Sequence, residues 1–164
     1  MPRSIRSSNF RWIFLLSGLL FALPGALPAQ TEQVNPAPLR VAVVGLVHGH
    51  AEGFFSALTQ YRNVELVGIA EPEPALAEKY EKKYGLDPGM FFLDMEQMIE
   101  SRHPEAVLVY TSISDHRKVI ETAAKFGVSE MVEKPLTISL EDVLAIRKVA
   151  REHRIHVLVN YETT

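Results

Sequence analysis

Apolar segments of strand length alternate with amphipathic helical segments from residue 39 to residue 160. This alternation restricts the possible folds more than any other feature of the chain. The first apolar segment, residues 39–44, is interrupted only by Arg40, which is typical of a parallel strand covered on both faces. Further strands are predicted at residues 64–70, 90–92, 106–110, around 131–132 and at 156–160.

Helical segments separate these strands, and most of them carry start or stop signals. Ala51, Phe54, Phe55 and Leu58 recur at helical spacing and form one apolar face. Strands and helices therefore alternate about every 25 residues. The remaining helices are predicted from an opening at Pro72 and Pro74 to a stop at Gly85, from a cap at Asp94, from His116 to Phe126, and from Ser139 to about His153.

This order of elements predicts an α/β fold, a Rossmann-type doubly wound parallel sheet with right-handed crossovers and helices on both faces. We assign residues 39–164 to this single domain. In open sheets of this kind, ligands bind beyond the carboxyl ends of the strands, where the strand order reverses. Functional residues are therefore expected directly after the strands, at 45–50, 71, 111–116, 133–135 and 160–161.

The N-terminus precedes this domain and has the order of a secretory signal. Three arginines and no acid are followed by a run of twelve mainly apolar residues and then by proline, glycine and alanine. This order predicts a signal peptide at residues 1–29 and export to the periplasm or the medium. Twelve apolar residues are too few to span a bilayer comfortably, which argues against a membrane anchor. Residues 30–38, which are polar and contain two prolines, are predicted to be a linker.

Charge and cysteine content exclude several classes of function. The chain has a formal net charge of −3, and removal of the three arginines of the signal peptide changes it to −6. An acidic domain lacks the basic surface that nucleic-acid binding requires, so no nucleic-acid partner is predicted. The chain contains no cysteine, which excludes disulfides, thiolate catalysis and thiolate metal sites. No membrane contact is predicted once the signal peptide is removed.

The motif G-L-V-H-G-H, which begins at Gly45, follows the first strand and is the first candidate site. Gly45 permits a tight turn, and the amides near His50 and Ala51, at the start of the next helix, are expected to be free donors for a pyrophosphate. In the full G-x-G-x-x-G fingerprint the second glycine lets the cofactor approach the backbone, and Val47 takes that place here. Gly49, one position out of register, restores part of this access.

The two histidines of this motif allow three interpretations. We expect His48 and His50 to donate hydrogen bonds to a bound phosphate or substrate. They could instead only cap the helix or pack against Phe54. A metal site would need a third ligand, and Glu52 is the only acid close to them in sequence, so no metal is predicted.

Two further candidates follow the second and fifth strands. An acid at Glu71 can accept both hydroxyls of an adenosine ribose and would repel a 2′-phosphate, which favours NAD over NADP. Lys134, next to Glu133, can hold a hydroxyl of a substrate or ribose and help move its proton, while Pro135 keeps Lys134 extended. The alternatives are a solvated loop acid at Glu71 and a surface ion pair at Glu133 and Lys134.

Together these motifs resemble the Gfo/Idh/MocA oxidoreductases. The resemblance rests on V-V-G at the first strand, T-S-I-S-D-H after the fourth, and Gly127 followed six residues later by E-K-P-L-T, and it covers about residues 39–161. Members of this family pair an N-terminal Rossmann domain with a C-terminal α+β domain and pass hydride between NAD(P) and a carbon of a sugar or polyol. The resemblance therefore implies NAD as cofactor and a sugar or polyol as substrate.

The resemblance also implies roles for individual residues. The loop at Gly45 would hold the pyrophosphate, and Glu71 would replace the usual aspartate on the ribose. Thr111 and Ser112 would lie along the nicotinamide half, and Lys134 would be the catalytic residue that contacts substrate and nicotinamide ribose. The predicted cofactor-binding residues are Gly45, Val47, His48, Gly49, His50, Glu71, Thr111, Ser112, His116 and Glu133.

Besides Glu71, the sequence departs from the family pattern at four further positions. Val47 and His50 replace small residues, Ser112 stands where proline is frequent, and Glu130 stands where a buried valine is usual. Because a lone buried carboxylate is costly, Glu130 is expected to have a partner or to lie at a sheet edge.

The mature residues have room only for the nucleotide domain, so we expect the family's C-terminal domain, which carries the general acid and base, to be absent here. We therefore expect the NAD-binding half of a sugar-type dehydrogenase, inactive alone, with oligomers only when the second domain is present. The alternative is an exported, non-catalytic module that binds a sugar or anion through His48, His50 and Lys134. A phospho-receiver domain is disfavoured because residues 45–51 lack clustered carboxylates.

Overall fold

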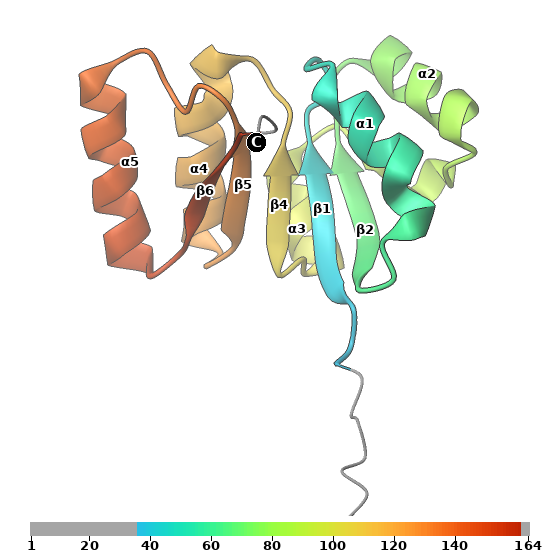
Figure 1. Cartoon of the computed structure of the whole chain (residues 1–164), viewed down its shortest axis with the longest axis horizontal. Coiled ribbons are helices and arrows are strands. Elements are labelled where there is room, and N and C mark those ends of the chain that lie inside the picture. Colours follow the sequence, from blue (N-terminus) through green and yellow to red (C-terminus); the bar gives the residue numbers. More distant parts are fainter. Residues whose placement is uncertain (1–35, 162–164) are drawn as a thin grey trace, which may run out of the picture. The chain divides into compact units, whose positions relative to one another are not determined.

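The computed structural model describes residues 36–161 of the chain (Figure 1). The predicted signal peptide, residues 1–29, lies outside the described residues, as does the predicted linker except for its last three positions. The signal peptide, the linker and export therefore stay predictions. Within the described part of the chain, no helix combines the length and the apolar character that crossing a membrane requires.

Six strands form one sheet, and every neighbouring pair of strands is parallel. Their order is β3-β2-β1-β4-β5-β6, so the direction of winding reverses between β1 and β4. This order confirms the predicted doubly wound parallel sheet. The strands are β1 (Leu39–Val44), β2 (Val64–Ala70), β3 (Phe91–Phe92), β4 (Ala106–Val109), β5 (Ser129–Glu133) and β6 (Val157–Asn160).

Three of the described helices begin or end at the capping residues that the sequence predicts. The Asp94 carboxylate accepts a hydrogen bond from the Gln97 amide at 2.8 Å, and the Ser139 hydroxyl accepts one from the Asp142 amide at 3.4 Å. Gly85 ends its helix with a φ of 63°. The α-helices of the described residues are α1 (His50–Ala57), α2 (Pro74–Tyr84), α3 (Met95–Arg102), α4 (His116–Lys125) and α5 (Leu140–His153).

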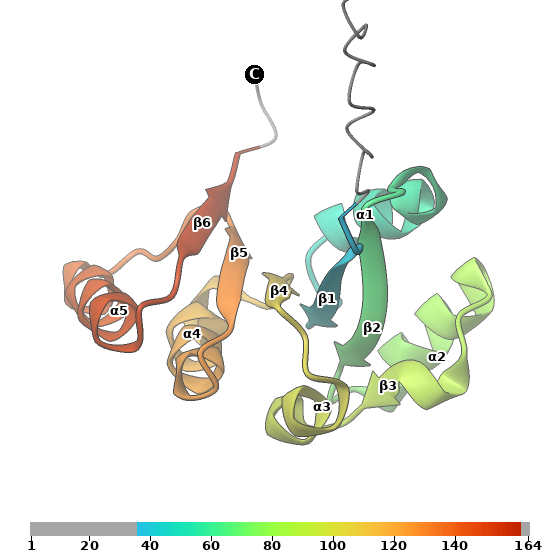
Figure 2. The same ribbon diagram turned by 90° about the horizontal axis from the view of Figure 1, so that it is seen from below.

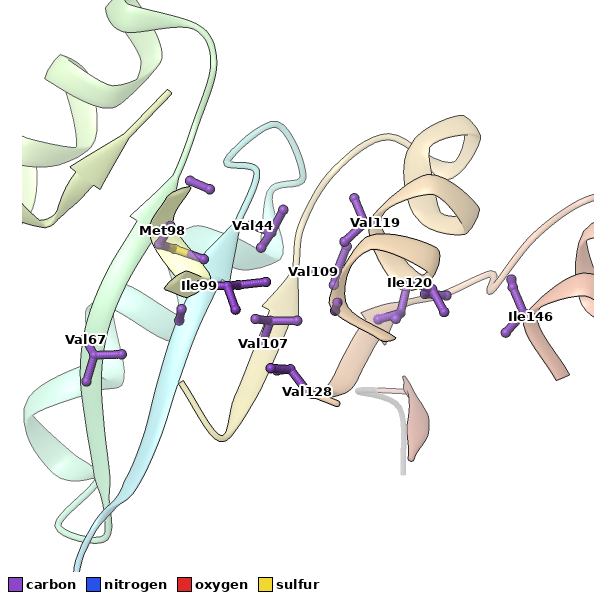
Figure 3. Packing of buried hydrophobic residues seen from close by; sticks show 14 residues of the cluster. Val44, Val67, Met98, Ile99, Val107, Val109, Val119, Ile120, Val128 and Ile146 are labelled. Carbon is purple, nitrogen blue, oxygen red and sulfur yellow. The ribbon is translucent and has the colours of Figure 1, made fainter. Parts of the chain in front are cut away.

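Apolar side chains fill both faces of the sheet. Figure 2 shows α3, α4 and α5 on one side of the sheet and α1 on the other. On the α1 side, Phe55 and Tyr80 pack with residues of β1 and β2. On the opposite side, buried residues of α3, α4 and α5 pack against the strands; this core includes Val44, Met98, Ile99, Val107, Val109, Ile120, Val128 and Ile146 (Figure 3). Burial of each such side chain contributes about 1.5–3 kcal/mol, so the two cores hold the strand ends in fixed positions.

Glu130 does not behave as the sequence predicted. It lies in β5, which is paired with β4 on one side and β6 on the other, so the position is not a sheet edge. Its side chain is 2% exposed, and neither carboxyl oxygen has a hydrogen-bond partner among the described residues. The predicted partner or edge position was therefore wrong. Burial instead raises the pKa of the Glu130 carboxyl to about 8, because a low-dielectric surrounding disfavours the charged form.

Candidate functional site

The segments predicted to carry function meet at one edge of the sheet, at the carboxyl ends of its strands. Gly45 follows β1, and its amide donates a hydrogen bond to the Ala70 carbonyl at the end of β2, at 2.8 Å. The His48 amide donates to the Tyr110 carbonyl, directly after β4, at 3.0 Å. The loop after β1 therefore lies between the ends of β2 and β4, where the strand order reverses.

Glycine is required at position 45 for two reasons. Its φ is +77°, in the left-handed region that residues with a side chain rarely adopt. A Cβ atom at this position would lie 2.5 Å from Thr111 Cγ2 and 3.0 Å from the Thr111 backbone nitrogen and Cα. The tight turn predicted at Gly45 is confirmed, and the turn is in contact with the segment that follows β4.

The amide groups of the loop are arranged differently from the prediction. The His50 amide donates to Nδ1 of His48 at 3.2 Å, and the Ala51 amide donates to the His48 carbonyl at 3.0 Å. The expectation that these two amides are free was wrong, because the ring nitrogen and the carbonyl oxygen of His48 accept hydrogen bonds from them. Among the loop amides from Gly45 to Ala51, those of Val47 and Gly49 have no hydrogen-bond partner in the described part of the chain. These two amides are the donors that the loop offers to an anion.

Glu71 ties the end of β2 to this loop. Its side chain is 4% exposed, and its Oε2 atom accepts a hydrogen bond of 2.7 Å from the Leu46 amide. Its Oε1 atom accepts a bond of 2.9 Å from the Glu73 amide. The alternative of a solvated loop acid is therefore wrong. Since a carboxylate oxygen can accept two hydrogen bonds, Glu71 keeps acceptor capacity for a ribose hydroxyl.

Two pockets flank the loop after β1. The first, of about 340 Å³, is bordered by Gly45 after β1, by Ala70 at the end of β2 and Pro72 after it, and by residues at and just before the starts of α3 and α4. The second, of about 410 Å³, is bordered by Val47 and the segments after β4 and β5. Thr111 lines both pockets, so they adjoin each other across the reversal of strand order.

The second pocket brings together the residues predicted for the nicotinamide half of a cofactor and two other predicted cofactor-binding residues, His116 and Glu133. It is lined by Thr111, Ser112, His116, Glu133 and Lys134. His116 is buried, and its Nδ1 lies 3.0 Å from the Leu136 carbonyl oxygen. Because a carbonyl oxygen can only accept a hydrogen bond, Nδ1 is the donor. The Nε2 atom of His116 is also buried, and it has no hydrogen-bond partner among the described residues.

Glu133 lies at the centre of a polar cluster that the sequence did not predict. Its side chain is 1% exposed, and its Oε2 lies 2.9 Å from Nδ1 of His50 and 4.0 Å from Nδ1 of His48. The Asn160 side chain, at the end of β6, donates to its Oε1 at 2.7 Å. The surface ion pair considered for Glu133 was therefore wrong, because this carboxylate faces the histidines and is buried.

Two features of the cluster were missed. Glu133 supplies the third group beside the two histidines, whereas Glu52 binds Lys79 and Lys83 instead. Asn160 was placed in an expected functional segment but given no role; its position directly at the end of a strand was the available signal.

Comparison with known proteins confirms the resemblance. The sequence profile of the Gfo/Idh/MocA oxidoreductases, a family with an NAD-binding Rossmann fold, matches residues 39–161. The chain is 31% identical over 121 residues to scyllo-inositol 2-dehydrogenase (NAD(+)) of Bacillus subtilis (strain 168), which covers 74% of this chain and 33% of that protein. It is 28% identical over 134 residues to glycosyl hydrolase family 109 protein 2 of Akkermansia muciniphila, which covers 75% of this chain and 28% of that protein.

The fold is also similar to that of solved oxidoreductases. An oxidoreductase from Agrobacterium radiobacter, solved in complex with NAD+, L-tartaric acid and magnesium, superposes with a TM-score of 0.68 at 20% identity. The match covers 76% of this chain and 35% of that one. This chain thus spans about a third, or less, of the length of these relatives.

Proposed function

The chain belongs to the Gfo/Idh/MocA oxidoreductase family, and on this basis we propose that residues 36–161 form the NAD-binding domain of a dehydrogenase for a sugar or polyol. One observation carries the proposal: two pockets adjoin at Thr111, across the point where the strand order reverses. A dinucleotide has two halves joined by a pyrophosphate, and open parallel sheets bind it across this point.

Each half of the cofactor has a matching set of residues. The pocket next to Ala70 and Pro72 takes the adenosine half, and the pocket lined by His116 takes the nicotinamide half. The pyrophosphate binds near the amides of Val47 and Gly49, where the N-terminal end of the α1 dipole favours a negative charge. These residues present the donors, the acceptor and the space that a dinucleotide needs.

The preference for NAD rests on Glu71. Its carboxylate lies directly after β2 and accepts hydrogen bonds from two backbone amides, which fix its position. A second negative group, such as the 2′-phosphate of NADP, would be repelled at this position. We therefore propose that NAD binds more tightly than NADP.

The chemistry of the reaction divides between cofactor and protein. Bound NAD supplies an acceptor for hydride from a carbinol carbon. Lys134 lines the nicotinamide pocket, where its amino group would hydrogen-bond the substrate hydroxyl and accept the proton that this hydroxyl releases as hydride leaves the carbon. Glu133 and Asn160 hold the end of β5 in place beneath it. Lys134 is thus the catalytic residue of the proposal.

The substrate class and the extent of activity are proposed from the relatives. A sugar or polyol is proposed because the relative with 31% identity is an inositol dehydrogenase. Since this chain spans about a third of that protein, we propose that residues 36–161 suffice for NAD binding, whereas turnover and oligomerisation need further residues of the kind that longer relatives contain.

Export remains part of the proposal because of the signal-like order of residues 1–29, and a fusion of these residues to a periplasmic reporter enzyme tests it.

Isothermal titration calorimetry of the chain with NAD+, NADH and NADPH tests the cofactor proposal. We expect micromolar or tighter binding of NADH and weaker binding of NADPH. Glu71→Ala should weaken binding of NADH, while the control Glu100→Ala, at an exposed position on α3, should not. Circular dichroism checks that both variants are folded. Absence of binding by all three nucleotides would overturn the proposal, and thermal stabilisation by a sugar alone would favour the non-catalytic binding module.

A further inference from the structure

We propose that His48, His50 and Glu133 together bind one divalent transition-metal ion, of the kind that zinc represents. Each of the three side chains offers one ligand atom, and these atoms lie within 4.8 Å of one another. The two histidines come from the loop after β1, and Glu133 comes from the end of β5. The fold therefore supplies the third ligand that the local sequence lacks.

The geometry of the cluster is close to that of a bound metal ion. In a tetrahedral site with bonds of about 2.1 Å, neighbouring ligand atoms lie roughly 3.4 Å apart. The distances from Glu133 Oε2 to the histidine nitrogens, 2.9 Å to His50 and 4.0 Å to His48, lie on either side of this value. The two imidazole rings are adjacent, with centroids 4.5 Å apart. Small rotations of these side chains would complete the site, at the cost of the 3.2 Å hydrogen bond from the His50 amide to His48.

The carboxylate of Glu133 is buried and positioned by a second residue. Only 1% of its side chain is exposed, and the Asn160 amide group donates to the oxygen that faces away from His50. Metal ligands are commonly oriented by such hydrogen bonds from outside the first coordination sphere. Imidazole and carboxylate groups are both ligands of zinc. A divalent cation bound between them would also compensate the negative charge of the buried carboxylate.

The location of the cluster indicates what the ion would contact. His48 and Glu133 line the same pocket as Lys134. Three protein ligands leave a fourth position on a tetrahedral ion for water or for an oxygen of a small molecule. A ligand that presents a hydroxyl or carboxylate oxygen next to Lys134 would therefore fill that position. The ion site itself does not depend on the binding of a dinucleotide.

Titration of the chelator-treated chain with Zn2+ by calorimetry, and with Co2+ by visible absorption, tests this proposal. We expect one ion per chain with micromolar or tighter affinity, and the intense visible bands of a four-coordinate Co2+ ion. His50→Ala and Glu133→Gln should each weaken Zn2+ binding at least about tenfold, and Asn160→Ala about 10- to 100-fold. The matched control, His156→Ala, removes an exposed histidine and should leave the affinity unchanged.

The outcomes separate this proposal from the cofactor proposal. If Zn2+ does not bind, or binds equally to wild type, His50→Ala and Glu133→Gln, then the contact between His50 and Glu133 is a hydrogen bond without a role in metal binding, and the metal site is refuted. NADH titrations of the same samples report on the cofactor separately, so either proposal can fail alone. Circular dichroism shows whether a variant is folded, and the Co2+ spectrum of wild type remains decisive if one variant is not.

Discussion

Replacement of Glu130 by glutamine removes a buried ionisable group while keeping the size of the side chain. In the wild-type protein this carboxyl has no hydrogen-bond partner among residues 36–161, and Glu130 is only 2% exposed. The folded protein can therefore keep it only in its neutral form at moderate pH. Glutamine is neutral at every pH, so the difference in stability between variant and wild type reports the effect of Glu130 ionisation.

The size of the effect follows from the two pKa values. Glu130 ionises near pH 4.5 in the unfolded chain and near pH 8 in the folded protein. Between these values the folded state binds more protons, so the free energy of unfolding falls by about 1.4 kcal/mol for each pH unit of increase. Relative to pH 4.5, the free energy of unfolding is lower by about 3 kcal/mol at pH 7, and it stops falling above about pH 8. Glu130→Gln should therefore match wild type near pH 4.5 and exceed its stability by about 3 kcal/mol at pH 7.

Urea unfolding of both proteins, followed by circular dichroism at several pH values from 4.5 to 8.5, measures this difference. The difference in free energy of unfolding should increase with pH across this range. An exposed control, Glu100→Gln, should show no such trend. A difference between Glu130→Gln and wild type that stays constant with pH would refute the reasoning, because it would mean that the buried carboxyl ionises as readily as in the unfolded chain.

Three further predictions concern the local backbone, and urea unfolding at neutral pH checks each of them. Gly45→Ala places a Cβ atom against Thr111 at a residue with positive φ, and it should lower the free energy of unfolding by about 2 kcal/mol or more. An unchanged free energy of unfolding would contradict the crowding between residue 45 and Thr111. Gly53→Ala, inside α1 with no atom within 4 Å of the new Cβ, should instead stabilise the protein by about 0.5–1 kcal/mol, and a loss would show an unrecognised contact. Asp94→Ala removes the cap on the Gln97 amide and should cost about 1 kcal/mol, so an unchanged midpoint would show that the cap does not stabilise α3.

Most of the fold could be predicted because its signals are local. Asp94 and Ser139 cap helices through amides three residues away, and Gly85 adopts the left-handed conformation that ends a helix. The apolar run from Leu39 to Val44 needs cover on both faces, and the structure provides it. Once strands and helices alternate, the rule of right-handed crossovers leaves few topologies, so the parallel sheet follows.

The site could be predicted only as a region. The strand ends identified the cleft, but the partners inside it depend on side-chain directions across long sequence separations. Glu133 meets His50 across 83 residues and Asn160 across 27, and no local pattern reports either contact. The amides near His50 were expected to be free because the turn of His48 back over the helix start is not visible in the sequence.

Glu130 shows a different limit of sequence reasoning. The rule that a buried carboxylate needs a partner assumes that the group is charged. The raised pKa removes the charge, so the carboxyl can remain buried without a partner at a cost in stability. A sequence does not reveal which of these two solutions a protein has adopted, because both place an acid within an apolar strand.

The dinucleotide cleft is tested most directly by NMR titration of the 15N-labelled chain with NADH. Binding as proposed should shift the amide signals of Val47, Gly49 and Thr111 most strongly, because these residues lie at the loop after β1 and where the two pockets adjoin. No change in these signals at saturating NADH, or changes confined to the opposite end of the sheet near Asn63 and Glu105, would contradict it.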